Sequence, residues 1–289
     1  MGHSMIVVTG ATGKLGRLVV NGLLAKLSPT DVAIAVRDPQ KAAEFAARGA
    51  SVRRADYNEP ASLEQAFAGA DTVMLISSNE VGRRVAQHEA VIEAAHKRGV
   101  KLLAYTSLLR ADTSGLAIAE EHRQTEKAIR ASGIPFVFLR NGWYIENHTD
   151  QIPTILQHNA IVGAAGEGRF ASATRQDYAD AAVAVLTSGG HDNTVHELAG
   201  DDAFTLSEFA AELSKQTDRT ITYNNLPPEE YKGVLAGAGL PEPFVNVLVD
   251  SDVQASRGAL HGSSADFRRL IGRPTTPLSA AIAAALRRI

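Results

Sequence analysis

The chain has 289 residues, of which 45% are hydrophobic, and its 29 basic and 32 acidic residues give a formal net charge of −3. This balance lacks the basic excess of nucleic-acid-binding proteins, so we expect no nucleic-acid partner. There is no cysteine, which excludes disulfides, thiolate metal ligands and a cysteine nucleophile, and we expect no metal site. No apolar run approaches about 18 residues, so we expect no membrane insertion. Residues 1–4 lack signal-peptide character and are expected to be an added remnant ahead of a soluble, cytoplasmic protein.

Short apolar runs alternate with amphipathic ones along the first 140 residues. The apolar runs predict strands at 5–9, 32–36, 51–55, 71–76, 100–105 and 134–139. Helices are predicted at 15–27, 39–48, 61–68, 81–98 and 117–131. The apolar stripe of the helix at 81–98 consists of Val81, Val85, His88, Ile92 and Ala95, so His88 is expected in the core. Near-continuous apolar strands separated by helices predict an α/β fold with a doubly wound parallel (Rossmann) sheet.

The regular alternation stops after residue 141. Helices are predicted near 151–158, 177–186 and 206–216, and further helices from Pro227 onward. Strands are predicted at 195–200 and 220–226, and a glycine-rich stretch spans 163–170. We therefore expect a Rossmann domain over residues 5–140. A smaller C-terminal α/β lobe over 141–289 would be mainly substrate-binding, with some of its elements returning to the Rossmann sheet.

The stretch VTGATGKLG places Gly10, Gly13 and Gly16 between the first predicted strand and the first predicted helix. Glycines at this spacing permit a tight turn, close approach of the backbone to a pyrophosphate and close helix packing on the sheet. The helix N-terminus adds free N–H groups and a partial positive charge. The motif predicts dinucleotide binding, and the alternative is an ordinary strand–helix turn.

The end of the second strand indicates which dinucleotide is bound. NAD enzymes tend to have an acidic residue about 20 residues after the glycines, and here that place is taken by Arg37. A guanidinium matches a 2′-phosphate in charge and geometry, and Lys41 lies one turn further on, so we expect NADPH. Asp38 is an alternative partner for a ribose hydroxyl. However, Asp followed by Pro39 is typical of a helix cap, and Arg37 and Lys41 could also be a solvated helix start.

Small polar residues follow several other strands, where ligands of open α/β sheets bind. Ser77, Ser78 and Asn79 follow the fourth strand, although either serine could instead cap the next helix. The sixth strand ends in the stretch RNGWY, with the single tryptophan of the chain, Trp143. Trp143 either fills the core or lines the site. No G-x-S-x-G nucleophile elbow and no P-loop signature is present.

Longer stretches of the sequence resemble a known family. TGATGKLG, VRDPQKA, LISSNEVGRR, AYTSLL, EEHRQTEKAIRASGI, LRNGWYIEN and GAAGEGRFASATRQDYADAA occur in order along residues 8–182. Together they resemble the NmrA-like group of atypical short-chain dehydrogenases/reductases and, within it, the bacterial NAD(P)H:quinone oxidoreductases of type 2. The likeness continues through HELAG and FTLSEFAAELSKQT.

The resemblance, together with the glycine motif and the charges, implies an NADPH site and a quinone lying against the nicotinamide, in a cleft between sheet domain and lobe. The implied cofactor-binding residues are Gly10, Ala11, Thr12, Gly13, Lys14, Leu15, Gly16, Arg37, Lys41, Ser77, Ser78, Asn79, Asn141, Gly142, Trp143, Tyr144, Ile145, Glu146 and Arg175. A small-molecule quinone is the implied partner, and the chain is expected to be a monomer or a homodimer.

The sequence lacks the tyrosine that serves as the catalytic proton donor in short-chain dehydrogenases. These enzymes use a Tyr-x-x-x-Lys pair, but here Lys127 is preceded four residues earlier by Arg123, which cannot give up its proton. Reduction of a quinone leaves a phenolate, a far weaker base than an alkoxide, so the missing tyrosine fits a quinone substrate.

Tyr144 and Lys127 are the candidate catalytic residues. Tyr105 and Arg175 are further candidates, although each of the four could be structural.

Three hypotheses follow. The first is two-electron reduction of quinones by NADPH through direct hydride transfer, with the protein supplying proximity and a flat apolar slot. The second is a non-catalytic NAD(P)-binding redox sensor that regulates a partner, as some NmrA-like proteins do. The third is reduction of another electron-poor ring or of an enone. The aromatic rings of RNGWY favour catalysis over sensing.

Overall fold

A computed structural model describes residues 4–289 of the chain, so residues 1–3 of the expected N-terminal remnant lie outside the described residues. The chain divides into two compact units. Unit 1 comprises residues 1–111, 120–141 and 175–196, and unit 2 comprises residues 112–119, 142–174 and 197–289. Each unit is described by itself.

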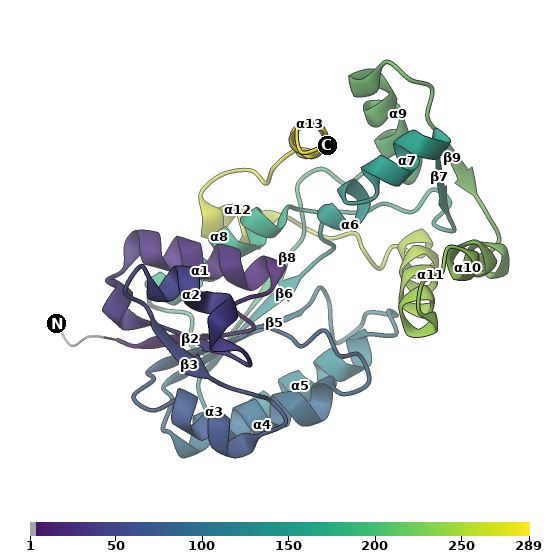
Figure 1. The fold of residues 1–289 in the computed structure, drawn as a ribbon. Helices are drawn as coiled ribbons and strands as arrows, with labels where there is room; N and C mark the ends of the chain where they lie inside the picture. Colours follow the sequence, from purple (N-terminus) through teal and green to yellow (C-terminus); the bar gives the residue numbers. More distant parts are fainter. Residues whose placement is uncertain (1–3) are drawn as a thin grey trace. The chain divides into compact units, whose positions relative to one another are not determined.

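Unit 1 is built on a seven-stranded sheet with the order β3-β2-β1-β4-β5-β6-β8 (Figure 1). Its strands are β1 (Ile6–Thr9), β2 (Val32–Val36), β3 (Ser51–Arg54), β4 (Thr72–Leu75), β5 (Leu102–Leu108), β6 (Phe136–Asn141) and β8 (Thr194–Leu198). All pairs from β3 to β6 are parallel. The order reverses between β1 and β4, which is where doubly wound sheets bind their ligands. The predicted fold class is confirmed.

Helices cover both faces of this sheet (Figure 1). One face carries α1 (Lys14–Lys26), α2 (Ala43–Ala46) and α8 (Arg175–Thr187), and the other carries α3 (Pro60–Ala66), α4 (Arg84–Lys97) and α5 (Ala119–Ala131). Helices α1 and α8 pack closely, because a Cβ on Gly22 would lie 2.7 Å from a methyl group of Val183. Two 3-10 turns, η1 (Pro29–Asp31) and η2 (Pro39–Ala42), flank β2.

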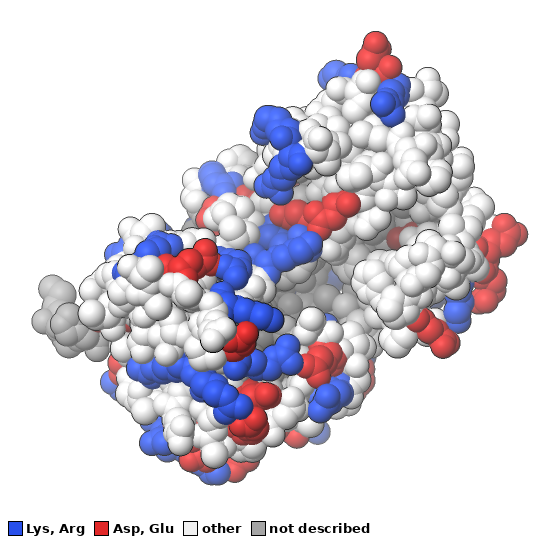
Figure 2. Space-filling view, in the orientation of Figure 1, with Lys and Arg blue, Asp and Glu red and all other residues white. Residues whose placement is uncertain are grey.

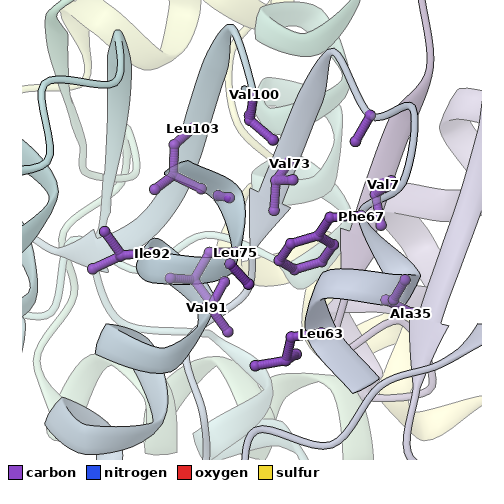
Figure 3. Close-up of a cluster of buried hydrophobic side chains, with 14 of the residues drawn as sticks. Val7, Ala35, Leu63, Phe67, Val73, Leu75, Val91, Ile92, Val100 and Leu103 are labelled. Atoms are coloured by element: carbon purple, nitrogen blue, oxygen red, sulfur yellow. The ribbon is translucent and has the colours of Figure 1, made fainter. Parts of the chain in front are cut away.

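One hydrophobic core of unit 1 lies between the sheet and the helices α3 and α4. Figure 3 shows Phe67, which follows α3, lying among Val7 and Val73 of the sheet and Leu63 of α3. All four side chains are fully buried. Burial of such side chains stabilises the fold by roughly 1.5–3 kcal/mol each. This core fixes β1 and β4 against each other, so the loops that follow them start from rigid positions.

Two predicted helices differ from the structure. The helix predicted over 81–98 begins only at Arg84, and Val81, placed on its apolar stripe, is 48% exposed. The helix begins at Arg84 because a residue of another helix caps its N-terminus. The carboxylate of Glu121 in α5 accepts hydrogen bonds from the amides of Gly82 (3.0 Å) and Arg84 (3.2 Å). The helix predicted over 39–48 is the 3-10 turn η2 followed by the short α2.

Unit 2 contains a small parallel sheet of β7 (Ala160–Gly163) and β9 (Thr222–Asn225) surrounded by helices. The helices are α6 (Glu146–Thr149), α7 (Ile152–His158), α9 (Leu206–Thr217), α10 (Pro228–Gly237), α11 (Glu242–Ser256), α12 (Ala265–Ile271) and α13 (Leu278–Leu286). A capping box between Thr205 and Glu208 opens α9. None of the helices in residues 4–289 has the length and apolar character to cross a membrane.

Candidate functional site

The loop between β1 and α1 has a backbone shape that requires its glycines. Gly10 has φ +60°, a left-handed conformation that favours glycine. The amide of Gly13 donates to the carbonyl of Gly10 (3.0 Å), and a Cβ on Gly16 would lie 2.3 Å from the same oxygen. Gly16 therefore permits close packing of the helix on the loop itself, rather than on the sheet as its place in the motif predicts.

The N-terminus of α1 is available to an anion. Gly13 precedes the helix without a side-chain cap, and the first turn carries no acidic residue. The start of α1 thus carries the partial positive charge of a helix N-terminus, with no side-chain cap and no acidic residue beside it, and such a charge favours phosphate groups. Because Gly10, Gly13 and Lys14 are exposed, a pyrophosphate has access to this turn, and the loop fits a dinucleotide.

A hydroxyl network holds the loop at the sheet edge. The Oγ1 of Thr9, the last residue of β1, donates to the carbonyl of Met74 (3.2 Å) and accepts from the amide of Ile76 (3.2 Å). The hydroxyl of Tyr57 donates to the same oxygen (2.7 Å). Burial raises the pKa of Tyr57 to about 12, so its hydroxyl stays protonated and keeps donating. The ends of β1 and β4 are thereby tied together.

The end of β2 carries the residues that were expected to choose the cofactor. Arg37 and Lys41 are exposed, and Nη1 of Arg37 lies 3.4 Å from Oε1 of Glu80. The carboxylate of Asp38 accepts from the amide of Gln40 (3.0 Å) and caps η2, with Pro39 next in the chain. The prediction that Asp38 is a cap is confirmed, and this contact occupies one of its oxygens. Arg37 remains the residue of this strand end with a charge suited to a 2′-phosphate.

The residues after β4 lie at the same edge, since β2, β1 and β4 are neighbouring parallel strands. The amide of Ser77 donates to Oγ1 of Thr106 (2.8 Å). The hydroxyl of Ser78 donates to the side chain of Gln87 (2.6 Å), and the amide of Ser78 donates to Nε2 of His88 (3.0 Å). These hydrogen bonds to residues of β5 and α4 hold the backbone of residues 77–78 in place. Neither serine caps α4, because Glu121 does so.

Two buried imidazoles lie beneath this edge. His88 is fully buried, as predicted, and its Nδ1 is hydrogen-bonded to Oγ1 of Thr125 (2.9 Å). His122 is hydrogen-bonded through Nδ1 to the hydroxyl of Tyr105 (2.7 Å). Burial lowers the pKa of each histidine to about 3, helped by the charge of Arg84. Both rings are therefore neutral near pH 7, and Tyr105, being fully buried, belongs to the sheet core.

Helix α5 carries the position where a catalytic tyrosine is expected. Arg123 stands there, and its guanidinium contacts the carboxylate of Glu120 (2.8 Å) and the carbonyl of Ala111 (3.0 Å). Lys127, four residues later, is exposed on the surface of α5. The preceding residue, Glu126, is buried and makes a bidentate ion pair with Arg140 of β6 (2.9 and 2.8 Å). Its carboxylate also accepts a hydrogen bond from the hydroxyl of Ser107 (2.6 Å).

The RNGWY stretch is split between the units. Asn141, buried, ends β6 in unit 1, whereas Trp143 and Tyr144 belong to unit 2 and are half-buried. The amide of Ile145 donates to the carbonyl of Ala173 (2.9 Å), and the amide of Ala173 donates to the carbonyl of Trp143 (3.2 Å). This bridge joins two stretches on which the resemblance rests, RNGWYIEN and ASATR. Glu146 opens α6, and Arg175 opens α8.

The structure thus brings one group of predicted residues together within unit 1: the loop at 10–16, Arg37, and Ser77 to Asn79. The candidate acids are not in one unit, since Lys127 is in unit 1 and Tyr144 in unit 2. Sequence reasoning missed Glu80, Arg83 and Tyr57. Glu80 and Arg83 lie within the quoted stretch LISSNEVGRR, but nothing local indicates that Glu80 contacts a residue of another strand end.

Comparison with known proteins finds relatives that match nearly the full length of this chain. Quinone oxidoreductase 2 of Escherichia coli K12 is 48% identical over 278 residues, 96% of this chain and 97% of that protein. A crystal structure of an NADPH-dependent quinone oxidoreductase from E. coli complexed with NADPH has a TM-score of 0.96 at 48% identity, covering 98% of this chain and 100% of the other.

A more distant structure has the same architecture. The triphenylmethane reductase of Citrobacter sp. complexed with NADP(H) is 37% identical with a TM-score of 0.93, covering 97% of this chain and 99% of the other. The family model described as the NmrA-like family matches residues 2–257. Because the family model matches most of the chain and a relative is 48% identical over 96% of it, the chain belongs to the NmrA-like family.

Proposed function

We propose that this protein is an NADPH-dependent quinone oxidoreductase that reduces quinones to hydroquinones by two electrons. The observation that carries the proposal is the uncapped glycine loop of β1 and α1 beside Arg37, in a chain whose relatives include a quinone oxidoreductase with NADPH bound. Unit 1 would hold most of the cofactor, and unit 2 would supply most of the substrate contacts.

The chain's residues would divide the binding as follows. The amides at the start of α1 would hold the pyrophosphate, with Gly10 and Gly13 giving close backbone approach. Arg37 and Lys41 would hold the 2′-phosphate. Ser77 and Ser78, whose amides donate to Thr106 and His88, would line the dinucleotide together with Asn79. Asn141 and Arg175 would add cofactor contacts within unit 1. Residues 142–146 of unit 2 are proposed as contacts of the nicotinamide, for which Trp143 and Tyr144 offer flat aromatic surfaces.

When bound, NADPH supplies a hydride, so that quinone, NADPH and one proton give hydroquinone and NADP⁺. The chain needs no strong acid for this reaction, because a phenolate oxygen is a weak base and takes its proton from water or a nearby donor. Arg123, in the place of the usual tyrosine, is engaged by Glu120 and Ala111 and holds the start of α5. Tyr144 and Lys127 are the proposed hydrogen-bond donors.

The test is an assay of purified protein with NADPH and a soluble benzoquinone, followed by loss of NADPH absorbance against a protein-free control. We expect one hydroquinone formed per NADPH consumed and no semiquinone signal in electron paramagnetic resonance. Accumulation of semiquinone would contradict the two-electron mechanism. Tight NADPH binding without turnover of several quinones would overturn the enzyme proposal in favour of a redox sensor.

A triphenylmethane dye belongs in the same assay. The Citrobacter relative is a triphenylmethane reductase, and such dyes are electron-poor carbon centres that also accept a hydride. Decolorisation with a higher kcat/KM than any quinone would favour reduction of an electron-poor dye over quinone reduction. The Lys127→Met and Tyr144→Phe variants, measured against pH, test the two proposed donors separately.

A further inference from the structure

Arg37 of unit 1 forms an ion pair with Glu80, an acidic residue that follows β4. Its side chain is 67% exposed, and its Nη1 lies 3.4 Å from Oε1 of Glu80. The two residues are 43 positions apart in the sequence and meet because β2 and β4 flank β1 in the sheet. The guanidinium expected to recognise a 2′-phosphate therefore has an anionic partner within the protein.

Glu80 is held in place by more than Arg37. The side-chain amide of Gln87, a buried residue of α4, donates to Oε2 of Glu80 (3.0 Å). The amide of Glu80 donates to the hydroxyl of Ser78 (3.2 Å), which in turn donates to Gln87 (2.6 Å). This closed set of neutral contacts orients the carboxylate, so its negative charge stays at the strand end when Arg37 moves.

A second arginine contacts the same carboxylate. Nη1 of Arg83 lies 3.2 Å from Oε2 of Glu80, and Nη2 of Arg83 donates to Oδ1 of Asn58 (3.0 Å). Asn58 is itself held by Asp56, which follows β3 and accepts from both the backbone and side-chain amides of Asn58 (2.9 and 3.1 Å). Arg83 is thus positioned beside Arg37, with Glu80 between the two guanidinium groups.

Basic side chains gather on the surface of this part of unit 1. Figure 2 shows Lys and Arg side chains gathered over the part of unit 1 where α2, β2 and β3 lie, with isolated acidic groups between them. Glu80 is 30% exposed, whereas the side chains of Arg37 and Arg83 are 67% and 64% exposed. An incoming anion can reach both guanidinium groups from solvent.

We propose that Glu80 is a replaceable counter-ion of the 2′-phosphate site: it neutralises Arg37 and Arg83 in the free protein, and the 2′-phosphate of NADP(H) takes its place on both. Arg83 is then a further phosphate-binding residue beside Arg37 and Lys41, and Glu80 is the residue that limits affinity for the phosphorylated cofactor. This inference rests on the proposed function, because it assumes that Arg37 faces the 2′-phosphate.

The exchange is favourable for simple electrostatic reasons. Exposed carboxylate–arginine pairs are weakly bound, and a phosphate carries up to two charges and more acceptor oxygens for a guanidinium. Glu80, still held by Gln87 and Ser78, remains near the bound phosphate and repels it. A dinucleotide without the 2′-phosphate does not displace Glu80 from the two arginines, so replacing Glu80 should change the affinity for that dinucleotide little.

The test compares 2′,5′-ADP with 5′-AMP, which differ only in the 2′-phosphate, by calorimetric titration. Removing the charge in Glu80→Gln should tighten 2′,5′-ADP roughly three- to ten-fold and change 5′-AMP less than about two-fold. Glu80→Ala, which adds no amide donor, should act in the same direction. Arg83→Ala should weaken 2′,5′-ADP by a similar factor. Glu93→Gln makes the same exchange in an exposed pair with Lys97 on α4 and should change neither affinity.

The outcomes separate the two proposals. A wild-type protein that binds 2′,5′-ADP no better than 5′-AMP would remove the 2′-phosphate site from the proposed function. A wild-type preference for 2′,5′-ADP that neither Glu80→Gln nor Arg83→Ala alters would overturn this inference and leave the proposed function standing. Direct titration of NADPH and NADH with the same variants should repeat the pattern, and thermal unfolding checks that each variant is folded.

Discussion

Gly16 has no room for a side chain beside Gly10, because a Cβ at position 16 would lie 2.3 Å from the carbonyl oxygen of Gly10 and 2.7 Å from the Cα of Ala11. The clashing atoms are backbone, so they move only if the loop moves. The same carbonyl accepts the hydrogen bond from Gly13 that closes the turn. The close approach of α1 to its loop and the shape of the glycine turn are therefore one structural feature.

Gly16→Ala should displace this loop and weaken NADPH binding by more than ten-fold, since the amides of α1 would leave the pyrophosphate position. Fluorescence titration of NADPH measures the loss. Gly233→Ala in α10, where a Cβ meets no atom within 4 Å, is the matched control and should bind normally. Unaltered affinity in Gly16→Ala would mean that this turn does not carry the phosphates.

Arg37→Ala should weaken NADPH roughly ten- to hundred-fold and NADH much less, because a charge-assisted contact to the 2′-phosphate is lost. Calorimetric titration of both cofactors gives the ratio. Lys97→Ala removes an equal charge from the far end of α4, where Lys97 pairs with Glu93, and should leave both affinities unchanged. Equal losses for NADPH and NADH would refute the assignment of Arg37 to the 2′-phosphate.

Glu126→Gln should destabilise unit 1 by about 3–5 kcal/mol, because it removes the negative charge that pairs with the buried guanidinium of Arg140. Urea unfolding measures the change. Glu59→Gln breaks the exposed pair with Arg54 and should leave stability almost unchanged. Replacing both buried partners, as Glu126→Leu with Arg140→Met, should recover much of the loss. A small effect of Glu126→Gln alone would show that the pair contributes little.

Buried His88 and His122 should make the protein less stable as pH falls. Burial lowers the pKa of each to about 3, so between about pH 3 and the unfolded value of 6.5 the unfolded chain binds more protons. The stability that each neutral ring contributes is present above pH 6.5 and is lost on acidification.

His122→Asn keeps a polar partner for Tyr105 but does not titrate. Between pH 7 and pH 5, the wild type should lose about 2 kcal/mol relative to this variant in urea unfolding. Parallel pH profiles for the two proteins would argue against a buried neutral His122.

Buried Asp252 of α11 should make the protein less stable as pH rises, the opposite of the effect of the two histidines. Its Oδ2 accepts from the amide of Ala164 (2.8 Å), and burial raises its pKa from 3.8 to about 6. The folded protein therefore binds the proton more readily, and the stability contributed by the neutral form is lost as pH rises from about 4 through 6.

Asp252→Asn keeps the oxygen that faces Ala164 and removes the charge. Its stability relative to wild type should rise by roughly 2–3 kcal/mol between pH 4 and pH 7. Urea unfolding at the two pH values measures this difference, and no relative gain at pH 7 would refute the buried charge.

Much of the architecture could be predicted because its signals are local. The apolar runs that became β1, β2 and β4 are buried on both faces of the sheet, and that burial is visible as continuous hydrophobicity. The glycine spacing of the first loop and the Asp38–Pro39 cap are equally local, since their geometry depends on neighbours within a few residues. The helix beginning at Arg84 was predicted too early because its cap, Glu121, comes from another helix.

The sequence by itself therefore determined the parallel sheet, the glycine turn between β1 and α1 and the likeness to a family, since periodicity and short motifs record what each segment buries and how it turns. Only the tertiary structure decided which side chains meet. It set Glu80 against Arg37 across two strand ends, buried the hydroxyl of Tyr105 against His122, and left Lys127 on the surface. Such contacts follow from the packing of segments far apart in the chain, and hydrophobic pattern carries no record of a partner tens of residues away.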